Sequence, residues 1–144
     1  MFVVDTNVLV YAADRSTAEH AVCRAKLESW RAAADPWYLT WSIVYEFLRV
    51  ITHPRVLRRP WSCADAWRFV MALRAAPGLS FLVEGERHEE LSGEMVTTMS
   101  DLRGNLLHDA HTAALMREHG VRVIYTRDTD FHRFPWLEVR DPLR

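Results

Sequence analysis

Four carboxylates stand at or near the ends of four separate apolar segments of this 144-residue chain. They are Asp5 after the run Met1–Val4, Glu46 in Trp-Ser-Ile-Val-Tyr-Glu-Phe-Leu, Asp109 in Leu-Leu-His-Asp-Ala-His, and Asp128 after Val-Ile-Tyr-Thr-Arg. Clustered carboxylates repel one another and raise each other's pKa unless a cation neutralises them. A set of oxygen ligands favours Mg²⁺ or Mn²⁺ over zinc, which prefers nitrogen and sulfur. If the fold brings these acids together, we expect a site for a hard divalent cation that hydrolyses a phosphodiester.

The pattern of apolar residues predicts alternating strands and helices. Runs typical of buried strands cover 1–4, 37–39, 79–83 and 121–125, with a short last candidate over 137–139. Helical periodicity covers 18–33, 43–51, 62–75, 86–102 and 105–118. The segment Asp5-Thr-Asn is expected to be a turn after the first strand. This order predicts an α/β fold with a central parallel sheet, helices on both faces and right-handed crossovers.

Particular residues are expected to bound and orient these helices. Ala21, Val22, Ala25 and Trp30 share one side of the helix over 18–33 and predict its buried face. Thr40 or Ser42 is expected to cap the helix that contains Glu46. Ser62 is expected to cap the next helix, and Gly120 to close the helix over 105–118 in a left-handed conformation.

The predicted sheet gives the four acids a reason to meet. Ligands of open parallel sheets bind at the carboxyl ends of the strands. Asp5 and Asp128 follow strands directly, whereas Glu46 and Asp109 are placed near the starts of helices, which begin at that same edge. Each acid also has an ordinary explanation. Asp5 could form a turn with Asn7, and Glu46 could face solvent. Asp109 could be a first-turn residue that the helix dipole alone stabilises, and Asp128 with Asp130 could cap the turn before Phe131. Four such acids at one edge favour a shared site.

Size and composition indicate one soluble domain spanning 1–144. No apolar run approaches the roughly 20 residues that a membrane span needs, and Asp5 interrupts the first apolar run, so no signal peptide is expected. We therefore expect a cytoplasmic protein with no membrane partner. Cys23 and Cys63 have no second Cys or His at metal spacing nearby and are interpreted as packed thiols in a reducing compartment.

The net charge of −1 argues against a generally basic nucleic-acid-binding surface. Of the 18 basic residues, however, 17 are Arg and only Lys26 is Lys. High-GC coding explains such a total, so local clusters carry more information. The densest is Arg55, Arg58 and Arg59 beside His53, and Arg is well suited to phosphate contacts.

Several motifs in order resemble the PIN-domain family, and in particular the VapC-type toxins of bacterial toxin-antitoxin modules. These motifs are Met-Phe-Val-Val-Asp5-Thr-Asn7-Val-Leu, then Glu46, then Asp109 in His-Asp-Ala-His-Thr-Ala-Ala-Leu, and Thr126-Arg-Asp128-Thr-Asp130-Phe131. The resemblance extends from residue 1 to about residue 139, and it implies a three-layer α/β/α sandwich.

The resemblance also implies an activity and partners. These are a Mg²⁺-dependent or Mn²⁺-dependent endoribonuclease, a small antitoxin protein that inhibits it, and a homodimer. Asp5, Glu46, Asp109 and Asp128 would bind metal and act in catalysis, with Asn7, Thr126 and Asp130 as supporting groups. Hydrolysis by a metal-activated water would leave a 5′-phosphate and a 3′-hydroxyl. Candidate contacts to RNA phosphates are Arg15, Arg49, Arg55, Arg58 and Arg59. Trp41 or Tyr45 could stack on a base, although core packing is the interpretation we favour for both.

Other functions remain open from the sequence. Asp5-Thr-Asn7 is similar to the start of haloacid-dehalogenase phosphatases, but these enzymes need a second Asp at the position of Asn7 and a basic residue, and the only Lys lies in the first predicted helix. His108-Asp109 is similar to the all-helical HD phosphohydrolases, which the strand pattern contradicts. His108 and His111 could bind zinc, but without further partners a surface or supporting role is favoured. The remaining alternative is a non-catalytic PIN-like interaction module whose acidic pocket binds a partner.

Overall fold

Five short parallel strands form the centre of the computed structural model, which describes residues 1–144. The strands are β1 (Phe2–Val4), β2 (Trp37–Thr40), β3 (Leu79–Leu82), β4 (Val123–Tyr125) and β5 (Glu138–Arg140). Their order across the sheet is β3-β2-β1-β4-β5, and every neighbouring pair is parallel. β1 is therefore central, and the direction of strand addition reverses between β1 and β4. Such a reversal leaves a crevice at the carboxyl ends of these two strands.

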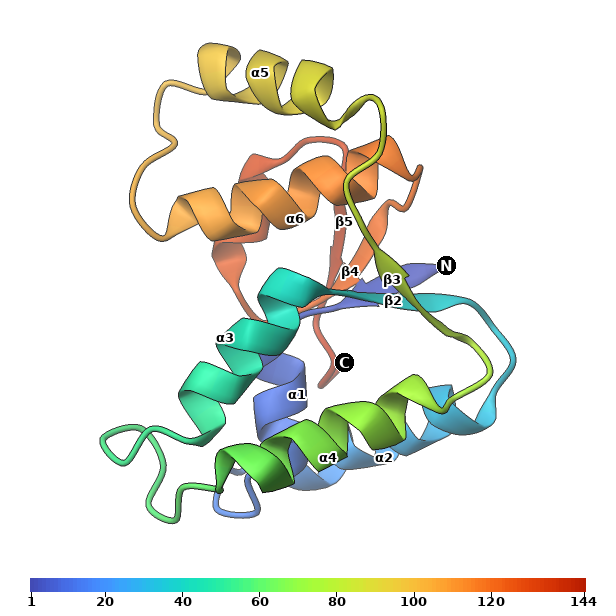
Figure 1. Cartoon of the computed structure of the whole chain (residues 1–144), viewed down its shortest axis with the longest axis vertical. Coiled ribbons are helices and arrows are strands. Elements are labelled where there is room, and N and C mark those ends of the chain that lie inside the picture. Colours follow the sequence, from blue (N-terminus) through green and yellow to red (C-terminus); the bar gives the residue numbers. More distant parts are fainter.

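Helices cover both faces of the sheet (Figure 1). One side carries α1 (Thr6–Ala13), α2 (His20–Ala32), α3 (Trp41–Ile51) and α4 (Cys63–Arg74). The other side carries α5 (His88–Thr98) and α6 (Leu106–Glu118). A 3₁₀ helix, η1 (Thr129–Arg133), follows β4. The predicted α/β/α sandwich with a parallel sheet is confirmed.

The segment after Asp5 is a helix, and the predicted turn is wrong. Asp5 caps α1, because its carboxylate Oδ1 accepts a hydrogen bond from the Thr6 backbone N–H at 2.7 Å. Val8, Leu9 and Ala12 are then fully buried, and the helix packs against α2 (His20–Ala32) and α3 (Trp41–Ile51). With eight residues, most of them apolar, α1 has no polar face for a periodicity analysis to detect.

The predicted buried face of α2 is also wrong in part. Cys23 and Leu27 are buried, whereas Val22 is 42% exposed. Ala21 and Ala25 are exposed as well. Trp30 packs on the rings of Phe2 and Tyr125 as a core-facing residue should. The face of α2 that packs on α1 therefore carries Cys23 and Leu27 and is rotated from the predicted face. Two of the four residues that defined the predicted face are alanines, whose small side chains are a weak guide to burial. Cys63 begins α4 and is exposed, so only Cys23 is a packed thiol.

The predicted caps are found where the sequence placed them. Thr40 accepts a hydrogen bond from the Ile43 N–H at 3.2 Å, and Ser62 accepts one from the Asp65 N–H at 3.1 Å. Gly120 follows α6 with a positive φ of 68°. The cap at Thr40 fixes the start of the helix that carries Glu46, and Gly120 ends the helix that carries Asp109.

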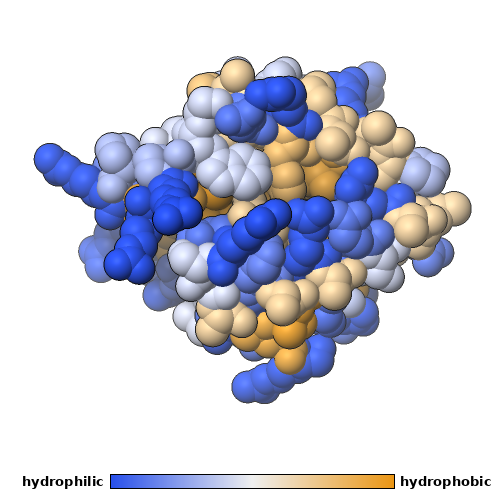
Figure 2. All heavy atoms as spheres, turned by 90° about the horizontal axis from the view of Figure 1, so that it is seen from below, coloured by the Kyte–Doolittle hydropathy of each residue, from blue (hydrophilic) through white to orange (hydrophobic).

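The surface is varied in character. Seen from below in Figure 2, the side of α2 and α4 carries hydrophilic side chains across its middle, with hydrophobic ones above and below. No helix combines the length and the apolar character needed to pass through a membrane.

Candidate active site

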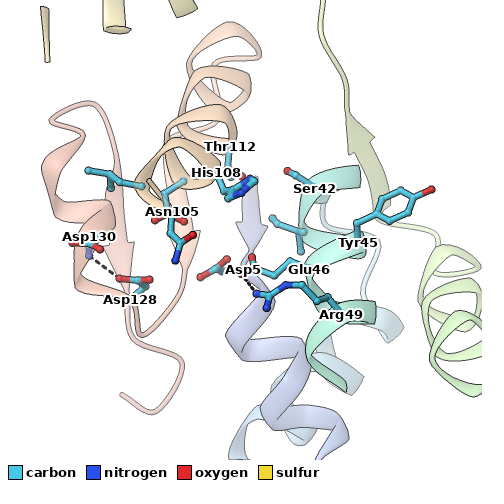
Figure 3. A pocket seen from close by; sticks show the side chains of 13 residues that line it. Asp5, Ser42, Tyr45, Glu46, Arg49, Asn105, His108, Thr112, Asp128 and Asp130 are labelled. Atoms are coloured by element: carbon cyan, nitrogen blue, oxygen red, sulfur yellow. Dashed lines mark hydrogen bonds and ion pairs between the residues drawn. The ribbon is translucent and has the colours of Figure 1, made fainter. Parts of the chain in front are cut away.

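The carboxylates singled out in the sequence line one cavity of about 670 Å³ (Figure 3). Asp5 follows β1, Glu46 comes from α3, Asp109 from the first turn of α6, and Asp128 with Asp130 from the segment after β4. The expected convergence is thus present in the fold. Glu46 is the sixth residue of α3, so its predicted place near a helix start is wrong. It reaches the cavity from the middle of the helix.

Asp5 is the most firmly held of the acids. Only 7% of it is exposed, and both of its carboxylate oxygens accept hydrogen bonds. Oδ1 accepts from the Thr6 N–H, while Oδ2 accepts from the Asn7 amide and the Thr126 hydroxyl, each at 2.6 Å. The Asn7 amide and the Thr126 hydroxyl therefore fix the orientation of the Asp5 carboxylate.

The segment that carries Asp128 is tied to the same network. The Asp128 N–H donates to the Thr126 hydroxyl at 2.9 Å, and the Arg127 N–H donates to the Asn7 side-chain oxygen at 3.2 Å. Asp128 also caps η1, since its Oδ1 accepts from the Asp130 N–H at 2.8 Å. The capping role considered from the sequence is present alongside the place in the cavity, and one carboxylate oxygen of Asp128 remains for a ligand.

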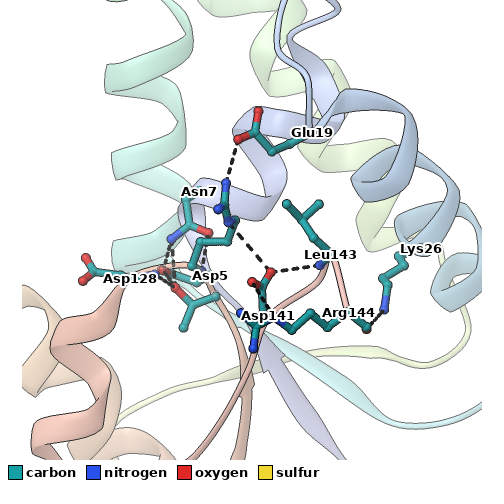
Figure 4. A network of polar contacts seen from close by, with 10 residues as sticks. Asp5, Asn7, Glu19, Lys26, Asp128, Asp141, Leu143 and Arg144 are labelled. Carbon is teal, nitrogen blue, oxygen red and sulfur yellow. Dashed lines mark hydrogen bonds and ion pairs between the residues drawn. The ribbon is translucent and has the colours of Figure 1, made fainter.

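Arg127 does not line the cavity and anchors this segment through two acids, Glu19 and Asp141, which are labelled in Figure 4. Its guanidinium lies 2.6 Å from Glu19 and 3.8 Å from Asp141. The first of these acids precedes α2 and the second follows β5. The residue between Thr126 and Asp128 thus holds three distant parts of the chain together.

Glu46 is oriented by a residue that sequence analysis missed. The Thr6 hydroxyl donates to Glu46 Oε2 at 3.0 Å, and Arg49 forms an ion pair with Oε1 at 3.4 Å. The Glu46 side chain is 44% exposed. Thr6 escaped notice because it was placed in a turn, where its hydroxyl would face solvent. The cavity lining contains four further polar residues that were not predicted as site residues: Ser42, Asn105, His108 and Thr112.

Burial and mutual repulsion make the cavity unfavourable for negative charge. Burial, together with the charges of Asp5, Asp128 and Glu46, raises the pKa of Asp109 to about 7. Burial raises the pKa of Asp5 to about 6, although the hydrogen bonds from Thr126 and Thr6 oppose this. The Asp109 carboxylate accepts no hydrogen bond within the chain, unlike those of Asp5 and Asp128.

The oxygen atoms lie close enough for one ion to contact several of them. Carboxylate oxygens of Asp109, Asp128 and Asp130 all lie within 4.8 Å of one another. Asp130 therefore belongs to the acidic group as closely as Asp128 does, although the sequence assigned it a supporting role. A set of carboxylate oxygens at this spacing suits a divalent cation with oxygen ligands.

The predicted phosphate contacts do not lie together. Arg49 lines the acidic cavity, whereas Arg15, Arg58 and Arg59 line a second cavity of about 630 Å³ with Trp61. Arg55 is exposed in the connection between α3 and α4 and lines neither.

The two aromatic candidates behave differently. Trp41 stacks on Phe81 with ring centroids 4.7 Å apart, in agreement with core packing. Tyr45 is 67% exposed and lines the acidic cavity, so core packing is wrong for this residue.

Two functions kept open by the sequence do not fit the structure. Asn7 donates to Asp5 where a haloacid-dehalogenase phosphatase needs a second carboxylate, and Lys26 lies on α2 against the carbonyl of Arg144. The five-stranded parallel sheet excludes an all-helical HD phosphohydrolase.

Comparisons of sequence agree with this geometry. A family model described as the PIN domain matches residues 2–137. Ribonuclease VapC43 of Mycobacterium tuberculosis is 40% identical over 143 residues, which cover 99% of this chain and 96% of the relative. Ribonuclease VapC48 of the same organism is 32% identical, with 96% and 94% covered.

Comparisons of structure give the same fold. Mycobacterium tuberculosis VapC20, described as a toxin that cleaves the sarcin-ricin loop, superposes with a TM-score of 0.68 at 18% identity, with 98% of this chain and 100% of that chain covered. VapBC2 from Rickettsia felis, solved with a DNA fragment from its promoter, superposes with a TM-score of 0.69 at 15% identity, with 96% of each chain covered. The chain therefore belongs to the PIN-domain family and, within it, to the VapC ribonucleases.

Proposed function

We propose that this protein is a Mg²⁺-dependent or Mn²⁺-dependent endoribonuclease that acts as the toxin of a toxin-antitoxin pair in the cytoplasm. The observation that carries the proposal is the meeting of Asp5, Glu46, Asp109 and Asp128 in one cavity. Relatives named as ribonucleases, 32% to 40% identical over nearly the whole chain, support RNA as the substrate.

The acidic cavity suits the proposed metal ion in its donor chemistry. Asp5, Glu46, Asp109 and Asp128, with Asp130 close by, would hold it through carboxylate oxygens. When bound, Mg²⁺ supplies positive charge that polarises a phosphoryl oxygen and lowers the pKa of a water molecule. A positive charge bound there would offset both the burial and the repulsion that raise the pKa of Asp109.

The protein's own residues prepare this chemistry. Asn7 and Thr126 hold the Asp5 carboxylate in one orientation, and the Thr6 hydroxyl orients the Glu46 carboxylate. Water attacks the phosphorus, the bond from phosphorus to the 3′-oxygen breaks, and the products carry a 5′-phosphate and a 3′-hydroxyl. No side chain is required as a nucleophile.

The second cavity supports a path for the RNA backbone. None of Arg15, Arg55, Arg58 and Arg59 forms an ion pair within the chain, whereas Arg49 pairs with Glu46. Free guanidinium groups beside Trp61 are suited to phosphate contacts and to stacking on an unpaired base. We propose that Arg15, Arg58 and Arg59 hold RNA phosphates away from the cut, with Arg55 nearby and Arg49 at the acidic cavity.

Asp109→Asn is the most direct test of the proposal. Because the Asp109 carboxylate accepts no hydrogen bond, this change removes a charge with little disturbance of structure. We expect RNA cleavage with Mg²⁺ or Mn²⁺ to fall by at least about a hundredfold, since a lost metal ligand removes stabilisation of the transition state. Cleavage is measured on labelled RNA with the purified protein, and the 5′ ends of the fragments are sequenced.

Asp35→Asn is the matched control, because Asp35 is exposed and lies outside both cavities. It should cleave as the unchanged protein does. Equal cleavage by Asp109→Asn and the unchanged protein would refute the assignment. Expression of the unchanged protein should arrest growth, and co-expression of a cognate small antitoxin should relieve the arrest.

A non-catalytic interaction module remains the alternative function. The ion pair of Arg49 with Glu46 favours this alternative, because a guanidinium already lies at the acidic cavity, where an Arg of a partner protein would bind. This alternative predicts no metal-dependent cleavage by the unchanged protein and weaker partner binding by Asp109→Asn. The resemblance also predicts a homodimer, which sedimentation of the purified protein measures.

A further inference from the structure

A second group of metal-ligating side chains lies between α5 and α6. Glu84 follows β3, His88 begins α5 and His111 comes from α6, and these two helices lie side by side in Figure 1. One nitrogen of each ring and one carboxylate oxygen of Glu84 all lie within 4.8 Å of one another. None of the three residues lines the acidic cavity.

The contacts within this group are already close. His111 Nε2 lies 2.8 Å from Glu84 Oε1, and the rings of His88 and His111 meet edge to face with centroids 5.5 Å apart. The Nδ1 atom of His88 is buried without a hydrogen bond, with the Glu118 carboxylate 3.5 Å away, while Nε2 lies 3.2 Å from the Ser92 hydroxyl. Buried ring nitrogens without partners are rare in folded proteins and call for an explanation.

The backbone around the group is fixed by α6. Glu118 is 7% exposed, and its carboxylate accepts the N–H groups of Gly85 at 3.2 Å and Arg87 at 3.1 Å. A side chain at Gly85 would place its Cβ 2.6 Å from Glu118 Oε1, so a larger residue here would require the Glu118 carboxylate to move. The segment from Glu84 to His88 is therefore held against α6 by contacts that do not involve the imidazoles.

A simple ion pair does not account for the arrangement. Contact between His111 and Glu84 alone would be an ordinary exposed pair. It leaves unexplained why His88 places a second imidazole within 4.8 Å of the same two groups, and why its buried Nδ1 has no hydrogen bond. Two imidazoles and one carboxylate are a donor set that binds zinc with a fourth position open, whereas Mg²⁺ and Mn²⁺ prefer oxygen ligands.

We propose that Glu84, His88 and His111 bind a zinc ion that joins α5 and the β3–α5 connection to α6. The sequence suggested zinc only for His108 and His111. The structure places His108 at the acidic cavity and supplies His88 and Glu84 as the missing partners of His111. The zinc ion fixes the helix that carries Asp109 two residues before His111, and its binding does not depend on the proposed nuclease activity.

The test is the zinc affinity of the full chain, measured by competition with a chromogenic chelator in excess Mg²⁺. We expect one zinc ion per chain. His88→Ala and His111→Ala, made separately, should each weaken zinc binding by at least about tenfold, since each removes one of three ligands. Zinc should raise the Tm of the unchanged protein and leave the Tm of His111→Ala nearly unchanged.

Two control variants separate this site from other zinc-binding groups. His132→Ala removes an exposed imidazole from η1, and Asp109→Asn weakens the acidic cavity; both should bind zinc as the unchanged protein does. His111 is 34% exposed, so its replacement should leave the fold intact, which circular dichroism checks. Unchanged zinc affinity in folded His111→Ala, or loss of zinc in Asp109→Asn, overturns the proposal. Because no RNA is present, these outcomes are independent of the proposed nuclease activity.

Discussion

At the scale of single residues, hydrogen bonds distinguish the acids of the cavity. Asp5 is locked by three donors, and Glu46 by Thr6, whereas Asp109 accepts none. Hydrogen bonds thus fix the orientation of Asp5 and Glu46 before any ligand binds. The Asp109 carboxylate has no such donor, so only a ligand can balance its charge. This difference decides which substitutions test function and which also disturb structure.

Thr6→Val tests the orientation of Glu46. Valine keeps the shape of threonine but removes the hydroxyl that donates to Glu46 Oε2. We expect metal-dependent cleavage to fall by about tenfold, with a higher Mn²⁺ concentration needed for half-maximal activity, because groups that orient metal ligands have effects of this size. Thr6→Ser keeps the donor and should retain most of the activity. If Thr6→Ser is as impaired as Thr6→Val, packing rather than the hydroxyl explains the loss.

At the scale of elements, the end of α6 sets the backbone before β4. Gly120 has a φ of 68°, which residues with a Cβ rarely adopt, and no atom lies within 4 Å of the Cβ position. Gly93 lies inside α5, also with open space around it. The two glycines therefore differ in backbone conformation alone.

Alanine at these two positions should change stability in opposite directions. Gly120→Ala should lower the free energy of unfolding by about 1 kcal/mol, because alanine is strained at positive φ. Gly93→Ala should raise it by about 0.5–1 kcal/mol, because alanine favours the helix interior. Urea unfolding curves measure both changes. Equal effects of the same sign would show that this account of the two glycines is wrong.

The elements that the sequence predicted are those with long or continuous apolar patterns. Val3 and Ile124 on the strands and Phe47 on α3 are each fully buried. They belong to apolar patterns with a regular spacing, and this spacing predicted the elements that carry them. α1 was missed because its eight residues are mostly buried or half-buried, and its start depends on the cap at Asp5.

The site followed the same rule. Its four main carboxylates were found because each follows or interrupts an apolar run. Thr6 and the partnership of His111 with His88 and Glu84 depend on contacts between distant segments, which no local pattern encodes. Sequence analysis therefore located the cavity but not the hydrogen bonds that orient it.

At the scale of the whole molecule, the acidic cavity links stability to pH. The folded-state pKa values of Asp5, about 6, and Asp109, about 7, lie above the ordinary value of 3.8. Between about pH 4 and pH 7 the folded chain holds protons that the unfolded chain has released. These two groups therefore make the metal-free protein less stable as pH rises through this range, and above pH 7 their effect stays constant.

Thermal unfolding with EDTA or MnCl₂ measures this linkage. Mn²⁺ should raise the Tm strongly at pH 8 and little at pH 5, where Asp109 is protonated. Without metal at pH 8, Asp109→Asn should be more stable to unfolding than the unchanged protein by about 1 kcal/mol, or about 3 °C in Tm, because it lacks the disfavoured charge. The gain is small because Asp109 is partly exposed and water screens its charge. The variant should also lose most of the Mn²⁺ effect. A Tm increase with Mn²⁺ that is equal at pH 5 and pH 8 would contradict the proposed cause.

The pairing of β1 with β4 also bears on when the active site forms during synthesis. Asp5 leaves the ribosome before the strand beside it, which begins at Val123, and Thr126 and Asp128 follow that strand. The central strand pair and the acidic cavity therefore cannot close until the segment from Val123 to Asp128 has also left the ribosome. Until then a nascent chain carries Asp5 without the Thr126 hydroxyl that orients it and without Asp128 beside it.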